Sequence, residues 1–196
     1  MPELVASSPL GTGGPMHWAS ASVTVSECAE LGLMHIKGRV DEAAAERIAG
    51  ALGVRLPGEF GRLTQAPVRA LRVREDHWCV IVEQSARAPL LRGLRQAVSG
   101  TSLLVADVSD GVLWLRVAGA AAAALIAAGC ALDLDRGALP VEHAAWTRLA
   151  RLRVLIARRT LECFELQVDA SYAHYAWDWL VENAALADAA CRRTGL

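Results

Sequence analysis

Lysine is almost absent from this sequence: Lys37 is the only one among 20 basic residues, and all the others are arginines. The 21 acidic residues bring the formal net charge to −1, with a sequence pI of about 6.5. A chain without an excess of positive charge lacks the field that gathers phosphates, which excludes non-specific binding to nucleic acid. The preference for arginine fits a biased genome composition, and it also fits polar interfaces, where the guanidinium forms paired hydrogen bonds.

Paired cysteines are also lacking. Their number is odd, no CxxC motif occurs, and each cysteine stands alone: Cys28, Cys79, Cys130, Cys163 and Cys191. This pattern predicts neither a disulfide framework nor a zinc site. The N-terminus has no basic start followed by an apolar core, and the longest uncharged run, residues 117–132, is too short and too rich in Ala and Gly to span a membrane. We therefore expect a reduced, soluble, cytoplasmic protein that does not enter a membrane.

Motifs of common catalytic and cofactor sites are missing as well. No serine lies in a Gly-x-Ser-x-Gly elbow, no GxGxxG follows a strand, and the Gly-rich segment near residue 12 lacks the lysine of a phosphate loop. Ser171 and His174 share a helix face, and we interpret them as a helix cap and a surface side chain. Asp133 and Asp135 could hold at most a weak Mg²⁺ or Ca²⁺ ion, and a solvated loop edge explains them better. We expect no catalytic, cofactor-binding or metal-binding residue in this chain.

Apolar residues are abundant: they make up 54% of the chain, above the roughly 45–50% of average soluble domains. This content excludes an intrinsically disordered chain. It also exceeds what a small monomer easily buries, and so indicates a surface that is covered by a partner.

The apolar patterns and turn signals recur in a definite order. From residue 31 they predict strand, helix, loop, strand, strand and helix, and a similar order follows Gly100. Residues 36–38 match residues 116–119, and residues 78–82 match residues 164–168. We predict an α+β fold made of two duplicated ferredoxin-like halves of the split βαβ type.

The predicted domain boundaries follow from these patterns. Residues 1–26 are rich in Ser, Gly and Pro and are expected to form a flexible N-terminal arm. Residues 27–100 form the first α+β half, and residues 101–190 form the second half, packed with the first as one body. Residues 191–196 are expected to be a tail.

The last predicted helix, which runs from Ser171 to about residue 187, contains four aromatic side chains within eight residues: Tyr172, Tyr175, Trp177 and Trp179. At about 100° per residue, one stripe on this helix consists of Ala173, Ala176, Trp177, Leu180 and Ala184, and a second of Tyr172, Tyr175 and Trp179. One core buries one stripe, and Tyr and Trp are the residues that anchor interfaces. The alternative is a helix enclosed within the monomer. We favour a partner interface at the four aromatic residues.

Three segments of the second half carry a family resemblance: residues 108–111 (Val-Ser-Asp-Gly), residues 129–134 (Gly-Cys-Ala-Leu-Asp-Leu) and Ser171-Tyr172-Ala173 followed by Trp177 and Trp179. In order and spacing they resemble the gamma subunit family of heterotetrameric sarcosine oxidase. Ala131 replaces the usual Pro of the family, and Tyr175-Ala176 stands where a Leu is common. These departures concern packing.

The resemblance implies a complex that oxidatively demethylates N-methyl amino acids, in which this chain is a non-catalytic, structural gamma-type subunit. Its partners would be alpha, beta and delta subunits, which carry the cofactors FAD, FMN, NAD, tetrahydrofolate and zinc, while this chain carries none. The resemblance also implies a fold similar to folate-binding aminomethyltransferase domains.

Two alternatives stay open. The first is a stand-alone folate-binding aminomethyltransferase-like protein, which needs a buried carboxylate to grip the pterin. Asp107, Asp110 and Glu165 are the plausible donors. The second is a binding module without an oxidase partner.

Overall fold

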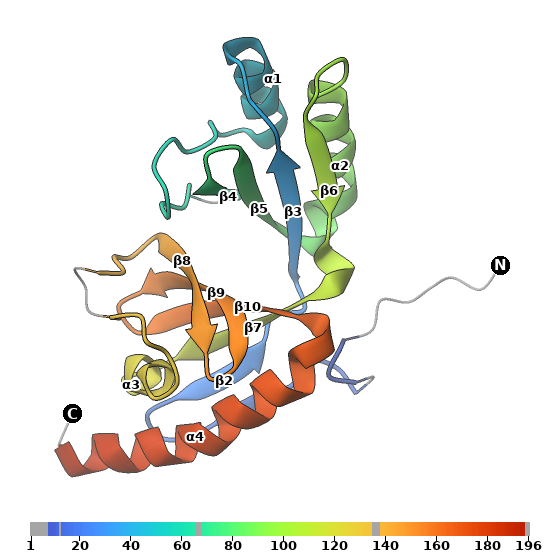
Figure 1. The fold of residues 1–196 in the computed structure, drawn as a ribbon. Helices are drawn as coiled ribbons and strands as arrows, with labels where there is room; N and C mark the ends of the chain where they lie inside the picture. The colour runs from blue at the N-terminus through green and yellow to red at the C-terminus, as the bar shows by residue number, and fades with distance from the viewer. Residues whose placement is uncertain (1–7, 12, 66–67, 135–137, 195–196) are drawn as a thin grey trace.

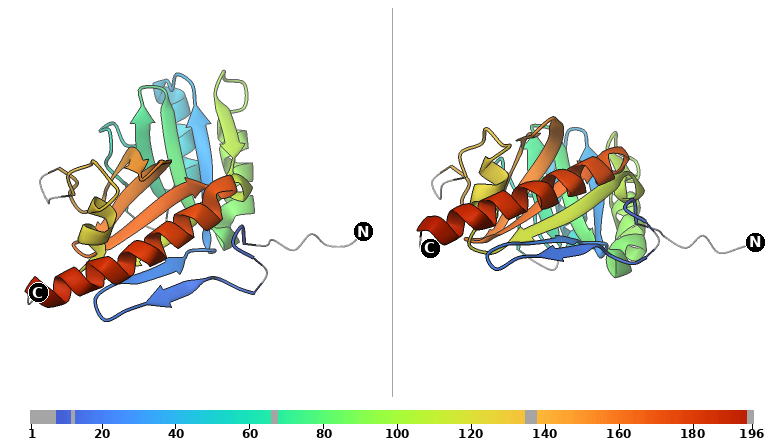
Figure 2. Two further views of the ribbon diagram at one scale, coloured as in Figure 1. Left: turned by 60° about the horizontal axis from the view of Figure 1, so that its bottom comes forward. Right: turned by 90° about the horizontal axis from the view of Figure 1, so that it is seen from below.

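The protein consists of two antiparallel sheets, each covered on its outer face by two helices (Figures 1 and 2). The computed structural model describes residues 8–11, 13–65, 68–134 and 138–194, with side chains up to residue 188. The predicted α+β class is confirmed. No helix within these ranges is long and apolar enough to cross a membrane.

The first half contains β3 (Leu31–Lys37), α1 (Glu42–Leu52), β4 (Arg69–Arg74), β5 (His77–Glu83), α2 (Gln84–Ala97) and β6 (Leu104–Asp107). Its sheet has the order β4-β5-β3-β6, with every neighbouring pair antiparallel. This is the strand order of a split βαβ unit. Helix α1 begins where the side chain of Asp41 accepts a hydrogen bond from the Ala44 N–H at 2.7 Å, and it ends at Gly53 in the left-handed region.

The second half contains β7 (Val112–Ala118), α3 (Ala122–Ala127), β8 (His143–Leu149), β9 (Leu152–Thr160), β10 (Cys163–Asp169) and α4 (Ala173–Thr194). Two strands from the N-terminal segment, β1 (His17–Ala19) and β2 (Thr24–Glu27), complete its sheet. The order is β1-β2-β7-β10-β9-β8. Strand β2 therefore lies beside β7 as β6 lies beside β3 in the first half.

The structure differs from the predicted arm and tail. Residues 17–19 and 24–26, assigned to the arm, lie in β1 and β2. The reason is a short alternation that the Ser-rich composition hides: Val23 and Val25 are buried, while Thr24 and Ser26 are not. Residues 191–194, assigned to the tail, continue α4. Residues 1–7, 12 and 195–196 lie outside the described residues.

Three apolar clusters separate the layers. One lies between α1, α2 and the four-stranded sheet, and includes Met34, Ile48 and Leu94. Another lies between α3, α4 and the six-stranded sheet, and includes Leu115, Leu125 and Phe164. The third lies between the two sheets, and its members come from both: Leu33, Leu71, Ile81, Trp114 and Leu155. The sheets thus share one interior.

A glycine in an unusual conformation ends the first strand of each half. Gly38 follows β3 with φ 120°, and Gly119 follows β7 with φ 121°, a region that side chains rarely adopt. A Cβ atom on Gly119 would lie 2.3 Å from the carbonyl oxygen of Ser22. The close approach of β2 to β7 therefore requires glycine at this position.

Candidate partner interface and neighbouring charged sites

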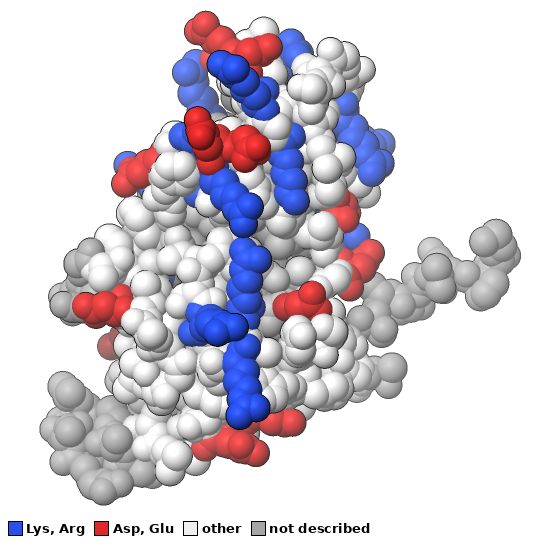
Figure 3. Space-filling view, viewed as in Figure 1, with Lys and Arg blue, Asp and Glu red and all other residues white. Residues whose placement is uncertain are grey.

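Charged side chains are unevenly distributed over the molecule. The face shown in Figure 3 has a column of Lys and Arg side chains down its middle, with acidic side chains against its upper part, beside its lower half and at the margins. Other arginines lie inside the protein or in contact with carboxylates of the same chain. The two groups of arginines have different structural roles.

Arg87 on α2 binds two of the three carboxylates that were candidates for gripping a pterin, Asp107 and Asp110. Its Nε donates to Asp107 Oδ2 at 2.6 Å, and its Nη1 and Nη2 donate to the two oxygens of Asp110 at 2.8 and 3.0 Å. The hydrogen bonds from Arg87 lower the pKa of Asp110. Although burial acts to raise it, hydrogen bonds from Arg87 and Ser109 also lower the pKa of Asp107. Both groups are ionised and paired at neutral pH.

The third carboxylate, Glu165 on β10, lies in a buried ionic cluster between the two sheets. It is 4% exposed, and it forms an ion pair with Arg69 of β4, which is 7% exposed. Arg116 Nη2 lies 3.2 Å from Glu165 Oε1, and Arg159 Nε lies 3.8 Å from Oε2. Because Arg69 belongs to the other sheet, the cluster joins the two halves. A carboxylate held by three guanidinium groups is not available to a pterin.

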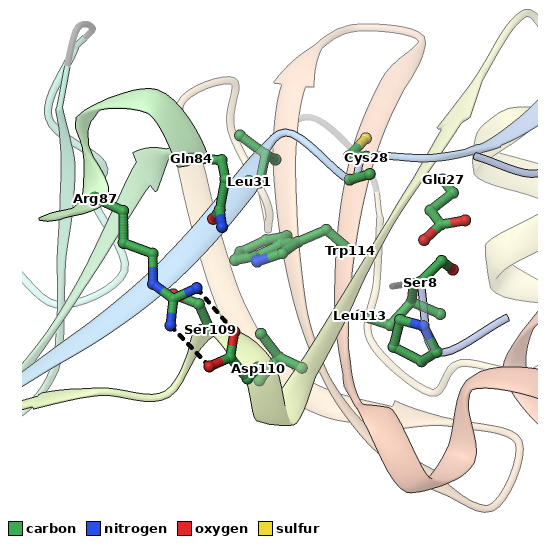
Figure 4. Close-up of a pocket in the computed structure, with 13 residues that line it drawn as sticks. Ser8, Glu27, Cys28, Leu31, Gln84, Arg87, Ser109, Asp110, Leu113 and Trp114 are labelled. Carbon is green, nitrogen blue, oxygen red and sulfur yellow. Dashed lines mark hydrogen bonds and ion pairs between the residues drawn. The ribbon is translucent and has the colours of Figure 1, made fainter. Parts of the chain in front are cut away.

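A cavity of about 390 Å³ lies beside the Arg87 pairs, between the start of α2, the 3-10 turn at Ser109–Gly111 and the first residues of β7. Figure 4 shows the Trp114 indole extending across it toward Gln84 and Arg87. Cys28 also lines the cavity. Burial raises the pKa of this thiol to about 12, so it is protonated at neutral pH and is a poor nucleophile.

Two buried polar atoms on paired strands have no hydrogen-bond partner within the described residues: Trp114 Nε1 and Gln167 Oε1. Trp114 and Gln167 lie opposite each other on β7 and β10. Each is at most 5% exposed, and Trp114 also belongs to the apolar cluster between the sheets.

The aromatic helix α4 places its two stripes as the periodicity predicts. The stripe of Ala173, Ala176, Trp177, Leu180 and Ala184 is buried, with no member more than 6% exposed. Figure 2 shows the helix lying across the outer face of the six-stranded sheet. Tyr172 and Tyr175 are 54% and 42% exposed. Tyr172 ends the 3-10 turn that leads into α4, and Tyr175 lies in the first turn of the helix.

Trp177 and Trp179 are less exposed than the two tyrosines. Trp177 is 6% exposed and packs in the chain's own core, which differs from the expectation that it lies at an accessible surface. Trp179 is half-buried, and a Cβ atom on Gly129 would lie 2.4 Å from its ring. Its ring therefore lies against the residue that ends the α3 segment, at the border between core and surface.

The other pairs singled out in the sequence are Ser171 with His174 and Asp133 with Asp135. Ser171 donates to Asp169 Oδ1 through both its N–H at 2.9 Å and its Oγ at 2.6 Å, while His174 is exposed. Asp169, not Ser171, occupies the cap position. Asp133 is exposed in a loop, and Asp135 lies outside the described residues.

A cluster of His35, His77 and Cys79 on β3 and β5 was not anticipated. Their ligand atoms lie within 4.8 Å of one another, and His35 Nδ1 is 2.6 Å from His77 Nε2, so that one imidazole donates a hydrogen bond to the other. Burial, the neighbouring His77 and the charge of Lys37 lower the pKa of His35 to about 4. Cross-strand pairing brings these residues together, and a spacing of 42 residues between the histidines gave no local signal.

The fold is that of an aminomethyltransferase-type α+β protein. Over 82% of this chain it is similar to 46% of the glycine cleavage system aminomethyltransferase T from Bartonella henselae, with a TM-score of 0.64 and 16% identity. It is more similar to a chain of the heterotetrameric sarcosine oxidase from Corynebacterium sp. U-96. That match has a TM-score of 0.81 and 24% identity over 88% of this chain and 89% of the other.

Sequence comparison defines the family. The sarcosine oxidase subunit gamma of Corynebacterium sp. (strain U-96) is 28% identical over 166 residues, which are 82% of this chain and 78% of the relative. The model of the sarcosine oxidase gamma subunit family matches residues 37–186. The chain belongs to this family, and the predicted resemblance is confirmed.

Proposed function

We propose that this chain is the non-catalytic, structural gamma-type subunit of a heterotetrameric sarcosine oxidase-like complex that oxidatively demethylates N-methyl amino acids. Its membership of the gamma subunit family supports the place in the complex. The observation that carries the non-catalytic role is the pairing of Asp107, Asp110 and Glu165 with arginines of the same chain. Each of the three candidate carboxylates is therefore already bound by an arginine of the same chain.

The role left to such a subunit is to hold neighbouring subunits in fixed register. FAD, FMN, NAD, tetrahydrofolate and zinc would be bound by the alpha, beta and delta subunits, so a reactive one-carbon product must pass between sites in an enclosed space. A rigid body with two sheets and a shared interior suits this purpose. The singly placed cysteines, of which Cys28, Cys79 and Cys130 are buried and free, favour a reducing cytoplasmic location.

The exposed face of α4 is the proposed contact with a partner subunit. Tyr172 and Tyr175 present large amphipathic rings outside a well-packed helix, and such rings are frequent interface anchors because they lose little conformational entropy on binding. Trp179 borders this surface.

We also interpret the two halves as copies of one ferredoxin-like unit. Strands β3, β5 and β4 correspond to β7, β10 and β9 in order and direction. Gly38 and Gly119 occupy the same place with nearly equal φ angles. In the second copy, β2 replaces the fourth strand.

Reconstitution tests the proposed function. We expect the chain, co-expressed with the alpha, beta and delta subunits of its complex, to co-elute with flavin absorbance at physiological salt. Titration of the isolated chain with tetrahydrofolate should show no binding in the micromolar range. Micromolar binding by the isolated chain would instead support the aminomethyltransferase alternative, and elution without flavin-carrying chains would support the free-standing module.

A matched pair of variants tests the interface. Replacing Tyr172 and Tyr175 by Ala should weaken subunit association by about 2 kcal/mol or more and leave the unfolding of the free chain unchanged. Phe60→Ala is the control, since Phe60 is an equally exposed aromatic residue (58%) outside α4. Equal affinity of the double variant and the wild type would remove α4 from the interface.

A further inference from the structure

Five cations form a basic ridge, which we define as Lys37, Arg74, Arg148, Arg151 and Arg153. All five are exposed, and none forms an ion pair within the described residues. By contrast, the arginines that contact carboxylates are Arg55, Arg62, Arg69, Arg87, Arg116 and Arg159. The chain has 21 acidic residues, yet none of those that the structure describes forms an ion pair with the ridge.

The β8–β9 hairpin brings part of this charge together. Arg148 and Arg153 lie directly opposite each other on the two strands, and Arg151 lies in the turn between them. Like charges in facing positions destabilise a strand pair. The guanidinium of Arg153 lies 4.3 Å from the centre of the Trp146 ring, which holds it in place. The hairpin thus keeps an unfavourable charge pair in a fixed geometry.

The first half supplies the rest of the ridge. Lys37 and Arg74 are both strand partners of His77, on β3 and β4 respectively. Burial lowers the pKa of His77, and the charges of Lys37, Arg74 and Arg153 lower it further, while Asp76 acts in the opposite direction. Arg153 of the second half is therefore close to the cations of the first, in agreement with the column in Figure 3.

The positive charge of the ridge determines which kind of group it can bind. A divalent cation at His35, His77 and Cys79 would be repelled by Lys37 and Arg153, which both act on the Cys79 thiol. Anionic carboxylates would be attracted by the same groups.

We propose that the basic ridge docks an acidic surface, made of Asp and Glu side chains, on a partner subunit of the complex. The proposal rests on the proposed function, and it adds a second contact surface, formed by both halves, to the aromatic face of α4. The carboxylates of the partner would separate Arg148 from Arg153 and relieve their repulsion.

Charge reversal in the co-expressed complex tests the proposal. We expect Arg148→Glu with Arg153→Glu to weaken association at least about tenfold at low salt, and to reduce the dependence of affinity on NaCl concentration. Arg92→Glu with Arg95→Glu changes the net charge equally on α2, at exposed positions outside the ridge, and should assemble normally.

The single variant Arg148→Glu separates docking from folding. It places a carboxylate opposite Arg153, so the free chain should melt at the same or a higher temperature while its association weakens. If Arg148 has a purely structural role, the variant should lower both the melting temperature and the affinity for the partner, and that result would overturn the proposal.

Lys37 provides a readout without mutation. It is the only lysine in the chain, so an amine-reactive reagent labels it as the single side-chain amine. We expect labelling of Lys37 to be several-fold slower in the assembled complex than in the free chain.

The outcomes separate this inference from the proposed function. If the wild-type chain fails to assemble with its partner subunits, the proposed function is overturned. If the wild type assembles and the Arg148/Arg153 variant assembles equally well, with Lys37 labelled at an unchanged rate, only the basic ridge is overturned. Tight binding of a short DNA duplex at 150 mM NaCl would indicate a nucleic-acid surface and would also overturn it.

Discussion

The buried ionic cluster around Glu165 and the basic ridge are built from the same residue type and differ in their counterions. Arg69, Arg116 and Arg159 converge on one carboxylate between the sheets. Arg148 and Arg153 face each other at the surface and form no ion pair with any acid among the described residues. The Arg69–Glu165 pair joins the halves of the fold. The facing arginines are exposed, and Arg153 stacks on Trp146.

This difference separates stability from recognition. A buried charge must be paired, because an unpaired one is strongly destabilising. An exposed charge costs little when it lacks a partner in the same chain, and it remains available to another chain. Arginine suits both positions, since its planar guanidinium donates hydrogen bonds to a carboxylate in a fixed geometry.

Removing the shared carboxylate is the largest expected disturbance. Glu165→Ala leaves Arg69 buried without its counterion, and we expect a loss of about 3–5 kcal/mol in the free energy of unfolding. Urea denaturation measures it. Glu162→Ala, an exposed glutamate at the start of the same strand region, is the control, and an equal loss in both variants would contradict the role of the cluster.

Arg87 gives an intermediate case, because one of its partners is buried and the other is not. The side chain of Asp107 is 12% exposed and that of Asp110 is 82% exposed. Arg87→Ala should lower the free energy of unfolding by about 1–3 kcal/mol, mainly by leaving Asp107 unpaired. The loss should shrink when Asp107→Asn is added. If the two changes are simply additive, the pair is not coupled.

The histidine pair beside the ridge should make stability depend on pH. The pKa of His35 falls from 6.5 to about 4 on folding, chiefly because of burial. Between pH 4 and 6.5 the unfolded chain therefore binds a proton at His35 that the folded chain does not bind. The contribution of His35 to the free energy of unfolding is fully present above pH 6.5 and is lost as the pH falls toward 4. Thermal melts from pH 7.5 to 4 should show this slope. His35→Asn should flatten it, and the exposed His174→Asn should not.

The smallest effect is expected on the ridge itself. Arg151→Ala should leave the free energy of unfolding within about 0.5 kcal/mol of the wild type. Calorimetry of the free chain measures it. A loss comparable to that of Arg87→Ala would show that the ridge has a partner within the chain, and the contrast between the two groups of arginines would disappear.

Local sequence patterns were sufficient to predict an element where only one of its faces is buried. The spacing of Ala173, Ala176, Trp177 and Leu180 predicted the buried side of α4, because a helix turns by a fixed angle per residue. The order of elements in each half was predicted from the same kind of pattern. The non-catalytic role of the chain remains a prediction.

Long-range pairing could not be predicted from the same patterns. The paired residues of β2 and β7 are 88 to 94 positions apart in the sequence, so β2 appeared to be part of an arm. The Arg69–Glu165 pair spans 96 residues, and neither residue carries a local sign of its partner. The arginines at positions 148, 151 and 153 are adjacent in sequence, yet only the sheet register shows that two of them face each other.

The sequence by itself determined most of the helices and strands from residue 31 onward, the α+β class and the family, because hydrophobic periodicity and turn residues act over a few positions. The tertiary structure alone decided which arginines are paired and which remain free, and which aromatic rings reach the surface. Those properties depend on electrostatic and packing contacts between residues that folding brings together. The number of residues between two positions in the sequence does not show how close they lie in space.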